Sequence, residues 1–489
     1  MSRMIYKLIG EPELALCAGG GNPDRRLYGA RWNRETNQLT RLYQAAEITT
    51  DTRNFGHFGS INPSYDNPFD RIYPWSKMAV CNVDLAKYRS GAYSLTECIT
   101  ARYGEPGFTY AGSSTNFVGR YRPEFWYKAE EDSSGNVDYL ISQVAREGFS
   151  HAEEAIDGIS FGIDDGAGGL TCGSGIPLTN ISVANIHGRA RASGFTIQDI
   201  RSLDEQIMLY LVEYANMNSQ AALGDGCSSC YRENDADVIS DVTTAGGRTS
   251  FQVTDSALSS AIYVGAQLDI GATKGAVTHR GLVAEFTAAN GVYSITLDRE
   301  LPVTDGMIMS VHGFSACEFD LLGRSIGSAS GYLGANTKGN SYYRGCVMFG
   351  NRYQYILGIY RQQNTNHLWL CPEDADPDDY DALNTSVHQD TGVALPALEA
   401  AGWQVVGGNA QRLPGLAAFM ATGTSSGTSA SPVGDQQYLP LPTTGNTILL
   451  SGCNAGLGWP CGLFGGYWRY GSGYSYWNYA ARPILKKSL

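Results

Sequence analysis

The sequence predicts a β-rich α+β fold, and three observations carry this prediction. Charged residues make up only 17% of the 489-residue chain, whereas Gly (59) and Tyr (30) are abundant. Short runs of β-branched and aromatic residues, separated by turn residues, recur along the chain. A strong helical period is found at one place only, near residues 203–217. Low charge with many glycines and tyrosines is typical of a fold rich in strands and loops, such as that of an extracellular or virion protein.

The totals exclude two classes of partner. The net charge is −13 and the sequence pI is near 5.0, whereas a nucleic-acid-binding surface needs clustered Lys and Arg. The pairs Arg25-Arg26 and Lys486-Lys487 are isolated. No run of 18 apolar residues is found, so we expect no membrane insertion. The first twenty residues also lack the apolar core of a secretory signal.

Residues 1–110 are predicted to form an N-terminal β-rich region. The segment 30–42 has a polar centre flanked by apolar residues, which predicts a hairpin. The segment 65–70 (Tyr-Asp-Asn-Pro-Phe-Asp) has the composition of a turn. This region is therefore predicted to consist of short strands joined by tight turns.

Two helices are predicted in residues 111–233. Ser202 and Glu205 have the spacing of a capping box, in which each side chain satisfies a backbone N–H at the helix start. One buried face follows at helical spacing: Leu203, Ile207, Tyr210, Leu211 and Tyr214. A shorter helix is expected near 138–147, on Tyr139, Ile141 and Val144.

Residues 234–312 have a different pattern, which predicts a small β-barrel or sandwich. Four β-branched or aromatic runs lie at 249–253, 267–270, 282–286 and 293–297. Asn290-Gly291 separates the last two, and Asn-Gly is a strong hairpin signal. The flanking segments, 111–233 and 313–489, look like parts of one domain. We therefore interpret 234–312 as an insertion within it.

Several catalytic and metal-binding patterns were weighed, and none is favoured. Gly323–Gly327 matches G-x-S-x-G, but the Gly/Ser-rich residues that follow do not continue as the helix that a nucleophile elbow requires. A glycan hydrolase needs paired carboxylates in a cleft, and nothing in the sequence pairs the loose candidates Glu124, Glu213 and Asp320. We therefore expect no catalytic residues.

Metal ligands are also not predicted. The acidic run from Asp374 to Asp381 is compatible with calcium, but Pro377 interrupts it and a solvated loop is the simpler interpretation. Cys227 and Cys230 form a single CxxC without a second pair, so loop cysteines, reduced or disulfide-linked, are favoured over zinc. We expect no cofactor.

The strongest functional signal is the composition of residues 454–479. This stretch holds five Tyr, three Trp and seven Gly, and its only charge is Arg469. Tyr and Trp offer rigid, amphipathic contact area, and Ser, Gly and Asn adapt around them, as in antibody binding loops. A buried aromatic stripe is the alternative, but the tyrosine hydroxyls need partners and the interleaved glycines would leave a core poorly filled. The pattern favours a binding surface.

The end of the chain resembles a known family. Gly465-Gly466-Tyr467-Trp468 is followed by Gly471, Trp477-Asn478 and Ala481-Arg482-Pro483. These motifs resemble the end of C-type-lectin-like domains, in the branch shared by formylglycine-generating-enzyme-like proteins and the variable proteins of diversity-generating retroelements, which include the phage major tropism determinant. That family has a Gly-Gly-x-Trp strand, a polar variable loop and a closing Gly-Ala-Arg. Here Ala480-Ala481-Arg482 closes the motif, a mild departure.

Upstream segments resemble a phage tail protein that carries such a domain. The similar segments are 73–76, 81–82, 103–107, 123–128, 179–185, 211–220, 343–345 and 350–351, together with the inserted β module. The resemblance implies a non-enzymatic receptor-binding protein of a virion, located in the phage tail and acting in host adsorption. It also implies a homotrimer whose residues 1–110 serve virion attachment and trimerisation. The implied partners are a host cell-surface receptor, either protein or glycan, and other tail proteins.

The resemblance also implies which residues bind ligand. Carried over position by position, the candidates are Asn454, Leu457, Trp459, Tyr467, Arg469, Tyr470, Ser472, Tyr474, Tyr476 and Asn478. Gly465, Gly466, Trp468 and Arg482 match scaffold positions instead. Tyr474 and Tyr476 alternate with Ser475, so we expect both rings on one face of a strand. The enzymatic branch needs reactive cysteines, and Cys453 and Cys461 match no motif of it. A structural tail or baseplate protein, whose lectin-like domain contacts only other virion proteins, is the alternative function.

Overall fold

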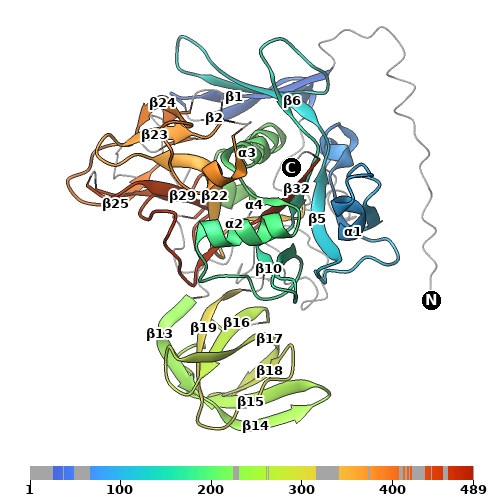
Figure 1. Cartoon of the computed structure of the whole chain (residues 1–489), viewed down its shortest axis with the longest axis vertical. Coiled ribbons are helices and arrows are strands. Elements are labelled where there is room, and N and C mark those ends of the chain that lie inside the picture. Colours follow the sequence, from blue (N-terminus) through green and yellow to red (C-terminus); the bar gives the residue numbers. More distant parts are fainter. Residues whose placement is uncertain are drawn as a thin grey trace.

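The structure is a computed structural model of the whole chain. It describes residues 26–36, 38–48, 67–223, 231–259, 261–262, 264–314, 316, 341–372, 375–406, 411–413, 416–417, 419–420, 435–441, 443–454 and 461–487. Figure 1 shows a body of several sheets around two central helices, with a smaller β module below it. The protein is a β-rich α+β protein, as the sequence predicts.

A five-stranded antiparallel sheet lies at the top of the body in Figure 1. Its order is β2-β1-β7-β6-β8, with β1 at Leu27–Asn33, β2 at Gln38–Tyr43, β6 at Phe125–Glu131, β7 at Val137–Ser142 and β8 at Ser150–Ala152. The pairing of β1 with β2 confirms the predicted hairpin. The predicted helix near 138–147 is wrong, because Val137, Tyr139 and Ile141 are buried along β7, which pairs with β1 and β6.

A six-stranded sheet forms a second wall. Its order is β12-β32-β9-β5-β3-β4, with β3 at Ala79–Asp84, β4 at Ile99–Arg102, β5 at Asn116–Arg122, β9 at Ala155–Gly158, β12 at Thr196–Ile197 and β32 at Pro483–Lys486. Short elements attached to the body are α1 (Leu85–Arg89), β10 (Gly162–Asp164), β11 (Leu170–Cys172) and the 3-10 helices η2 (Gln44–Glu47), η4 (Pro68–Arg71) and η5 (Trp75–Lys77). In both the five-stranded and the six-stranded sheet, strands that precede residue 110 pair with strands that follow it.

Three helices follow along the chain: α2 (Val183–Ala192), α3 (Ile200–Tyr214) and α4 (Ser219–Leu223). The predicted helix is α3, and all of its residues from Ser202 onwards are buried. Its capping box, however, starts three residues earlier than predicted. The Asp199 side chain accepts from the Ser202 backbone N–H, and the Ser202 hydroxyl accepts from the Asp199 N–H. Glu205 instead pairs with Arg122 at 2.7 Å.

The third sheet of the body carries the C-terminal region. Its order is β24-β23-β22-β29-β30-β28-β25, with β31 beside β22. The strands are β22 (Tyr353–Arg361), β23 (His367–Leu370), β24 (Gln389–Ala394), β25 (Gly402–Val405), β28 (Gln436–Leu439), β29 (Thr447–Ser451), β30 (Gly466–Tyr467) and β31 (Tyr479–Ala480). Two small ladders, β20 (Ser341–Tyr343) with β21 (Cys346–Phe349) and β26 (Gln411–Arg412) with β27 (Phe419–Met420), and the 3-10 helix η8 (Pro377–Tyr380) complete the body.

The residues predicted as an insertion form a seven-stranded module, seen at the bottom of Figure 1. Its order is β13-β19-β16-β17-β18-β15-β14, with β13 at Tyr231–Val238, β14 at Ser240–Ala245, β15 at Arg248–Thr254, β16 at Ala266–Gly271, β17 at Val277–Ala289, β18 at Val292–Leu297 and β19 at Ile308–Phe314. Asn290 and Gly291 both have positive φ (52° and 78°) and join β17 to β18, so the predicted hairpin is confirmed.

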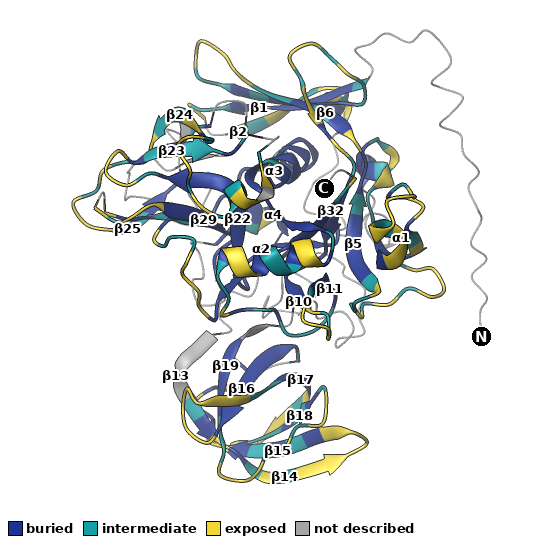
Figure 2. Cartoon of the chain, viewed as in Figure 1, coloured by how far each residue is buried: buried dark blue, intermediate teal, exposed yellow. Residues whose placement is uncertain are grey.

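The body and the module bury separate hydrophobic cores. One buried cluster runs through all three sheets and the helices of the body, and a second, around Phe251, Leu268 and Ile295, lies within the module. Figure 2 shows the buried residues of the body gathered around α3 and β22, and the outer strand β14 of the module exposed. Among the residues that the structure describes, no helix has both the length and the apolar composition needed to cross a membrane.

Candidate binding site

The C-terminal segment leaves the third sheet as a loop and returns to it. The Trp468 backbone N–H donates to the Tyr438 carbonyl (3.0 Å), and the Tyr470 carbonyl accepts from the Ile448 N–H (3.1 Å), so the start of the loop, just after β30, is bonded to β28 and β29. Trp468 is fully buried. Gly465, Gly466 and Arg482, the other positions matched to the scaffold, are buried too.

The loop backbone is held by partners outside the loop. The Tyr476 carbonyl accepts from the Asn180 N–H (3.0 Å), and the Ser472 carbonyl accepts from Val183 at the start of α2 (3.4 Å). The Tyr355 hydroxyl, on β22, lies 2.9 Å from the Tyr474 carbonyl oxygen. Three carbonyl groups of the loop are thus paired with a helix start and a strand of the body. This arrangement fixes the loop without using its own side chains.

Aromatic rings of this loop are stacked at the surface. The rings of Tyr470 and Tyr474 are parallel within 2°, with centroids 3.9 Å apart, and Tyr476 lies 6.3 Å from Tyr474. Tyr474 is 38% exposed and Tyr476 is 37% exposed, which is unusual for large aromatic side chains in this protein. These rings thus form an exposed aromatic cluster near the C-terminus.

The ring contacts continue from the loop onto two neighbouring strands. Tyr467 lies 4.7 Å from Tyr438 on β28 and 5.7 Å from Trp403 on β25. The exposed guanidinium of Arg469 lies 5.3 Å from the Tyr470 ring and 5.8 Å from the Tyr438 ring, in cation–π geometry. We call this group the tyrosine surface. It consists of Trp403, Tyr438, Tyr467, Arg469, Tyr470, Tyr474 and Tyr476.

The tyrosine surface is almost neutral. Arg469 carries its only charge, and the Tyr467 hydroxyl, 3.4 Å away, helps to raise the pKa of that guanidinium. Partial burial, with a further contribution from neighbouring tyrosines, raises the pKa of Tyr470 and of Tyr474 above the ordinary value. These phenols therefore stay protonated near neutral pH and can both donate and accept hydrogen bonds.

Five of the ten predicted ligand-binding residues lie together in this surface, three lie elsewhere, and two fall outside the described residues. Ser472 is half-buried, and its carbonyl is used to hold the loop. Asn454 is half-buried beside Asn351, with which it forms a parallel bridge. Asn478 is only 6% exposed, and its carbonyl accepts from Tyr353, so we leave it out of the surface. Leu457 and Trp459 lie outside the described residues.

The predicted strand at 474–476 is wrong. Residues 472–476 form a turn and an extended loop, and the next strand, β31, starts at Tyr479. Tyr474 and Tyr476 are neighbours because the loop curves, with Tyr474 N–H donating to the Gly471 carbonyl (3.1 Å). Sequence reasoning also missed Trp403 and Tyr438. Each is a single aromatic residue in a short strand, and nothing in the sequence links either of them to residue 470.

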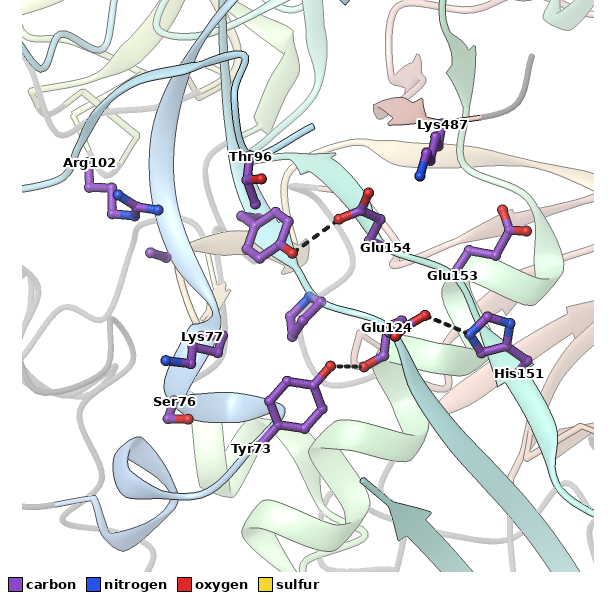
Figure 3. A pocket seen from close by; sticks show the side chains of 13 residues that line it. Tyr73, Ser76, Lys77, Thr96, Arg102, Glu124, His151, Glu153, Glu154 and Lys487 are labelled. Atoms are coloured by element: carbon purple, nitrogen blue, oxygen red, sulfur yellow. Dashed lines mark hydrogen bonds and ion pairs between the residues drawn. The ribbon is translucent and has the colours of Figure 1, made fainter. Parts of the chain in front are cut away.

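A cavity separate from the tyrosine surface lies beside the five-stranded and six-stranded sheets, as Figure 3 shows. This cavity of about 1070 Å³ has Lys77 and Arg102 on one side and Glu124 with His151 on the other. The Glu124 carboxylate lies 3.2 Å from the His151 ring. Both side chains are widely exposed.

The remaining hydrolase candidates do not join this cavity. Glu213 is fully buried, and its carboxylate pairs with Arg344 at 2.6 Å, so it contributes to the core and to no cleft. Asp320 and the Gly323–Gly327 motif lie outside the described residues.

The metal candidates are used for local structure where they are described. Asp376 caps η8, Asp378 pairs with Arg191 (2.6 Å) and Asp381 lies 2.7 Å from the His187 ring, which fits the interpretation of a solvated loop. Asp374, Cys227 and Cys230 lie outside the described residues. Within the described ranges, no three His, Cys, Asp or Glu side chains lie close enough together to hold a metal ion.

Comparison with known proteins gives no relative from which to interpret this site. No family model matches the chain, and no curated protein matches it either. The geometry of the tyrosine surface is therefore the basis for the proposals below.

Proposed function

We propose that this chain is a non-enzymatic binding protein of a phage tail, which attaches to a ligand on the host surface through the tyrosine surface. The observation that carries the proposal is the stacked, exposed pair Tyr470 and Tyr474 on a loop whose backbone is held from outside. Rigid aromatic anchors supply binding energy at low entropic cost, because little side-chain freedom is lost on contact.

The assignment to the C-type-lectin-like branch remains part of this proposal. It is supported by where the family motifs fall. The Gly-Gly-x-Trp motif includes β30 and ends at buried Trp468, the polar loop follows at 469–478, and Ala480-Ala481-Arg482 leads into β32. This is the order of strand, variable loop and closing motif that the family has.

A trimeric tail protein would gain strength from repetition. One tyrosine surface with a single charge offers modest affinity, whereas three copies on one particle bind with an effective concentration that multiplies weak contacts. The proposal therefore needs only a weak single-site affinity. Attachment to a host that displays the ligand densely would still be stable.

The decisive experiment compares two tyrosine variants in a cell-binding assay. Fluorescently labelled protein is titrated onto a panel of bacterial strains, as the wild type, as Tyr474→Ala and as Tyr93→Ala. Tyr93 is a matched control, since it is 48% exposed but lies on a separate turn beside Lys87. We expect Tyr474→Ala to lower binding at least tenfold, in the range of an interface hot spot, and Tyr93→Ala to leave it unchanged.

Two results would contradict the proposal. Full binding by a folded Tyr474→Ala protein would remove the tyrosine surface from the interaction. Absence of binding to every strain, combined with co-assembly with other tail proteins, would favour the alternative of a structural tail or baseplate protein. Circular dichroism of both variants keeps a folding defect from being mistaken for either result.

A further inference from the structure

A cavity lies beside the loop of the tyrosine surface, at the junction of the body and the inserted module. The cavity has a volume of about 490 Å³. Asn180 and Trp477 line it from the body, and Asp269, Lys274, Arg280 and His312 line it from the module. A cavity of this size suits one small chemical unit of a ligand.

The side chains of His312 and Trp477 stack on each other and form the floor of this cavity. The ring of His312 lies over the indole of Trp477, with centroids 5.3 Å apart and planes within 24°. His312 Nδ1 lies 2.6 Å from an Asp269 carboxylate oxygen, and the other Asp269 oxygen accepts from Gln267 (3.0 Å). The buried carboxylate is thus held by module residues, and the aromatic floor is shared between module and body.

A second contact, next to the stack of His312 and Trp477, joins the inserted module to the body. The Arg352 guanidinium lies 5.5 Å from the Trp477 ring centroid, and its Nη2 donates to the Gln267 side-chain oxygen at 2.9 Å. Arg352, Gln267 and Trp477 are all buried. The junction cavity therefore has preformed walls, as small-molecule sites usually do.

Positive charge lies at the rim of the cavity. Lys274 is exposed, and the side chain of Arg280 is about a third exposed (33%). Asp269 is the one carboxylate among the described lining residues, and it faces His312 and, at 3.4 Å, the Arg280 Nε. The chain has a net charge of −13, yet the described lining has two cations, Lys274 and Arg280, and one acid. The local charge favours an anionic group of a ligand.

The cavity adjoins the loop that carries the tyrosine surface, because Trp477, which lines the cavity, directly follows Tyr476. The Tyr476 and Trp477 rings are 6.0 Å apart, so the exposed loop passes directly from the surface to the cavity wall. Asn180, which also lines the cavity, holds the Tyr476 carbonyl. A ligand that covers Tyr474 and Tyr476 would therefore reach the cavity with its next unit.

We propose that the junction cavity is a subsite for a carboxylate-bearing sugar, such as a uronic acid, within a glycan ligand of the tyrosine surface. The inference rests on the proposed binding function, because it concerns the same ligand. Protonated tyrosine hydroxyls beside aromatic faces suit the mixed polar and apolar faces of sugar rings. The Arg280 guanidinium would pair with the carboxylate through charge-assisted hydrogen bonds, with Lys274 as a second cation.

The test monitors Trp477 directly. The protein is labelled with 5-fluorotryptophan, and its 19F NMR signal from Trp477 is identified by its loss in Trp477→Phe. Glucuronate is titrated to tens of millimolar at constant ionic strength, with glucose and acetate as matched neutral and anionic controls. We expect a saturable shift of the Trp477 signal with glucuronate, and little or none with glucose or acetate.

Variants separate this subsite from the proposed function. Arg280→Ala should weaken the glucuronate response at least tenfold, and Arg280→Lys, which keeps the charge, should weaken it less. Tyr474→Ala should leave the response intact while cell binding falls. If instead Tyr474→Ala leaves cell binding intact while the Trp477 response stays, the proposed function fails and the subsite stands.

Three outcomes would overturn the subsite. The first is an unchanged Trp477 signal throughout the glucuronate titration. The second is an equal response to acetate, which would show an adventitious anion only. The third is a stronger response to hexaglutamate than to glucuronate, which would indicate an acidic peptide ligand instead.

Discussion

Two groups of tyrosines in this protein have similar ring contacts and opposite surroundings. Tyr210, Tyr214 and Tyr343 lie in the interior with centroids 5.1 to 6.0 Å apart, and all three are at most 1% exposed. The Tyr343 hydroxyl donates to the Glu213 carboxylate (2.7 Å), which Arg344 also binds. The tyrosine surface has equally close rings, but its hydroxyls face no carboxylate within the described residues.

The difference teaches that ring clustering alone does not mark a site. Among the interior tyrosines, the Tyr343 hydroxyl has its polar partner in a buried ion pair, which forms at the cost of desolvating two charges. In the tyrosine surface, the hydroxyls of Tyr467, Tyr470 and Tyr474 interact with one another, and that of Tyr467 also with Arg469. The two groups therefore differ in the partner of the phenol, and four predictions test this difference, from the largest expected effect to the smallest.

Removal of the interior cation should cost the most. Arg344→Ala leaves the Glu213 carboxylate buried with Tyr343 and Asn67 as its remaining partners, so the free energy of unfolding should fall by about 3–5 kcal/mol. Chemical denaturation measures this. Arg248→Ala, which breaks an exposed pair with Glu285, is the control and should change stability by less than about 1 kcal/mol. A small loss of stability in Arg344→Ala would mean that the interior tyrosine group tolerates the loss of its cation as well as an exposed ion pair does.

A second carboxylate on α3 should make stability depend on pH. Burial raises the pKa of Glu205 to about 7, despite the nearby Arg122, whereas the ordinary value is 4.5. Between these pH values the folded state holds a proton that the unfolded state has lost. Stability should therefore fall as pH rises from about 5 to 7, by about 2 kcal/mol. Denaturation curves for the wild type and Glu205→Gln should diverge over this range, and parallel curves would contradict the prediction.

Matched hydroxyl deletions compare the two groups directly. Tyr343→Phe leaves the Glu213 carboxylate without one buried donor, so it should destabilise the protein by about 1–3 kcal/mol. Tyr474→Phe removes a hydroxyl at the surface and should change the unfolding free energy by less than about 0.5 kcal/mol. The same denaturation series measures both. Equal losses would show that Tyr474 belongs to the structural group.

The smallest effect concerns two glycines of the loop. A Cβ at Gly471 would lie 3.0 Å from the Asn446 carbonyl oxygen, whereas one at Gly473 would meet no atom within 4 Å. We expect Gly471→Ala to cost about 1 kcal/mol and to weaken cell binding by displacing Tyr470. Gly473→Ala should leave stability unchanged or raise it by about 0.5 kcal/mol. Thermal melts measure the stability of the two variants, and the cell-binding assay measures their binding. Equal stability and equal binding of Gly471→Ala and Gly473→Ala would argue against close packing of the loop at Gly471.

Local patterns predicted the elements whose causes are local. The hairpin at 30–42 and the Asn290-Gly291 turn each depend on residues close in sequence, and both are confirmed. The error at 138–147 has a different cause. Val137, Tyr139 and Ile141 alternate as a strand does. Their strand β7 pairs with β6, which is close in sequence, and with β1, which lies more than 100 residues earlier. The helix cap was predicted three residues too late. Asp199–Ser202 and Ser202–Glu205 have the same spacing, and only the fold shows that Glu205 pairs with Arg122 instead.

The candidate site was predicted in part. Composition pointed to the stretch 454–479, and the family resemblance named Tyr467, Arg469, Tyr470, Tyr474 and Tyr476 within it. The structure brings these five residues together. Trp403, Tyr438 and the junction cavity could not be predicted, because they come from strands and a module that only the fold places beside the loop. Asn478 looked equivalent to its neighbours in sequence, yet its carbonyl pairs with Tyr353 and the residue is buried.

The loop that presents these tyrosines is held by the carbonyl groups of Ser472, Tyr474 and Tyr476. Every residue type has such a carbonyl, so the hold does not depend on which side chains occupy these positions. Exchanging those side chains would alter specificity while the shape of the loop persists. Under the proposed function, the protein would combine a constant frame with an exchangeable contact face, a property that favours evolvability and would allow new specificities to be selected from a randomised library.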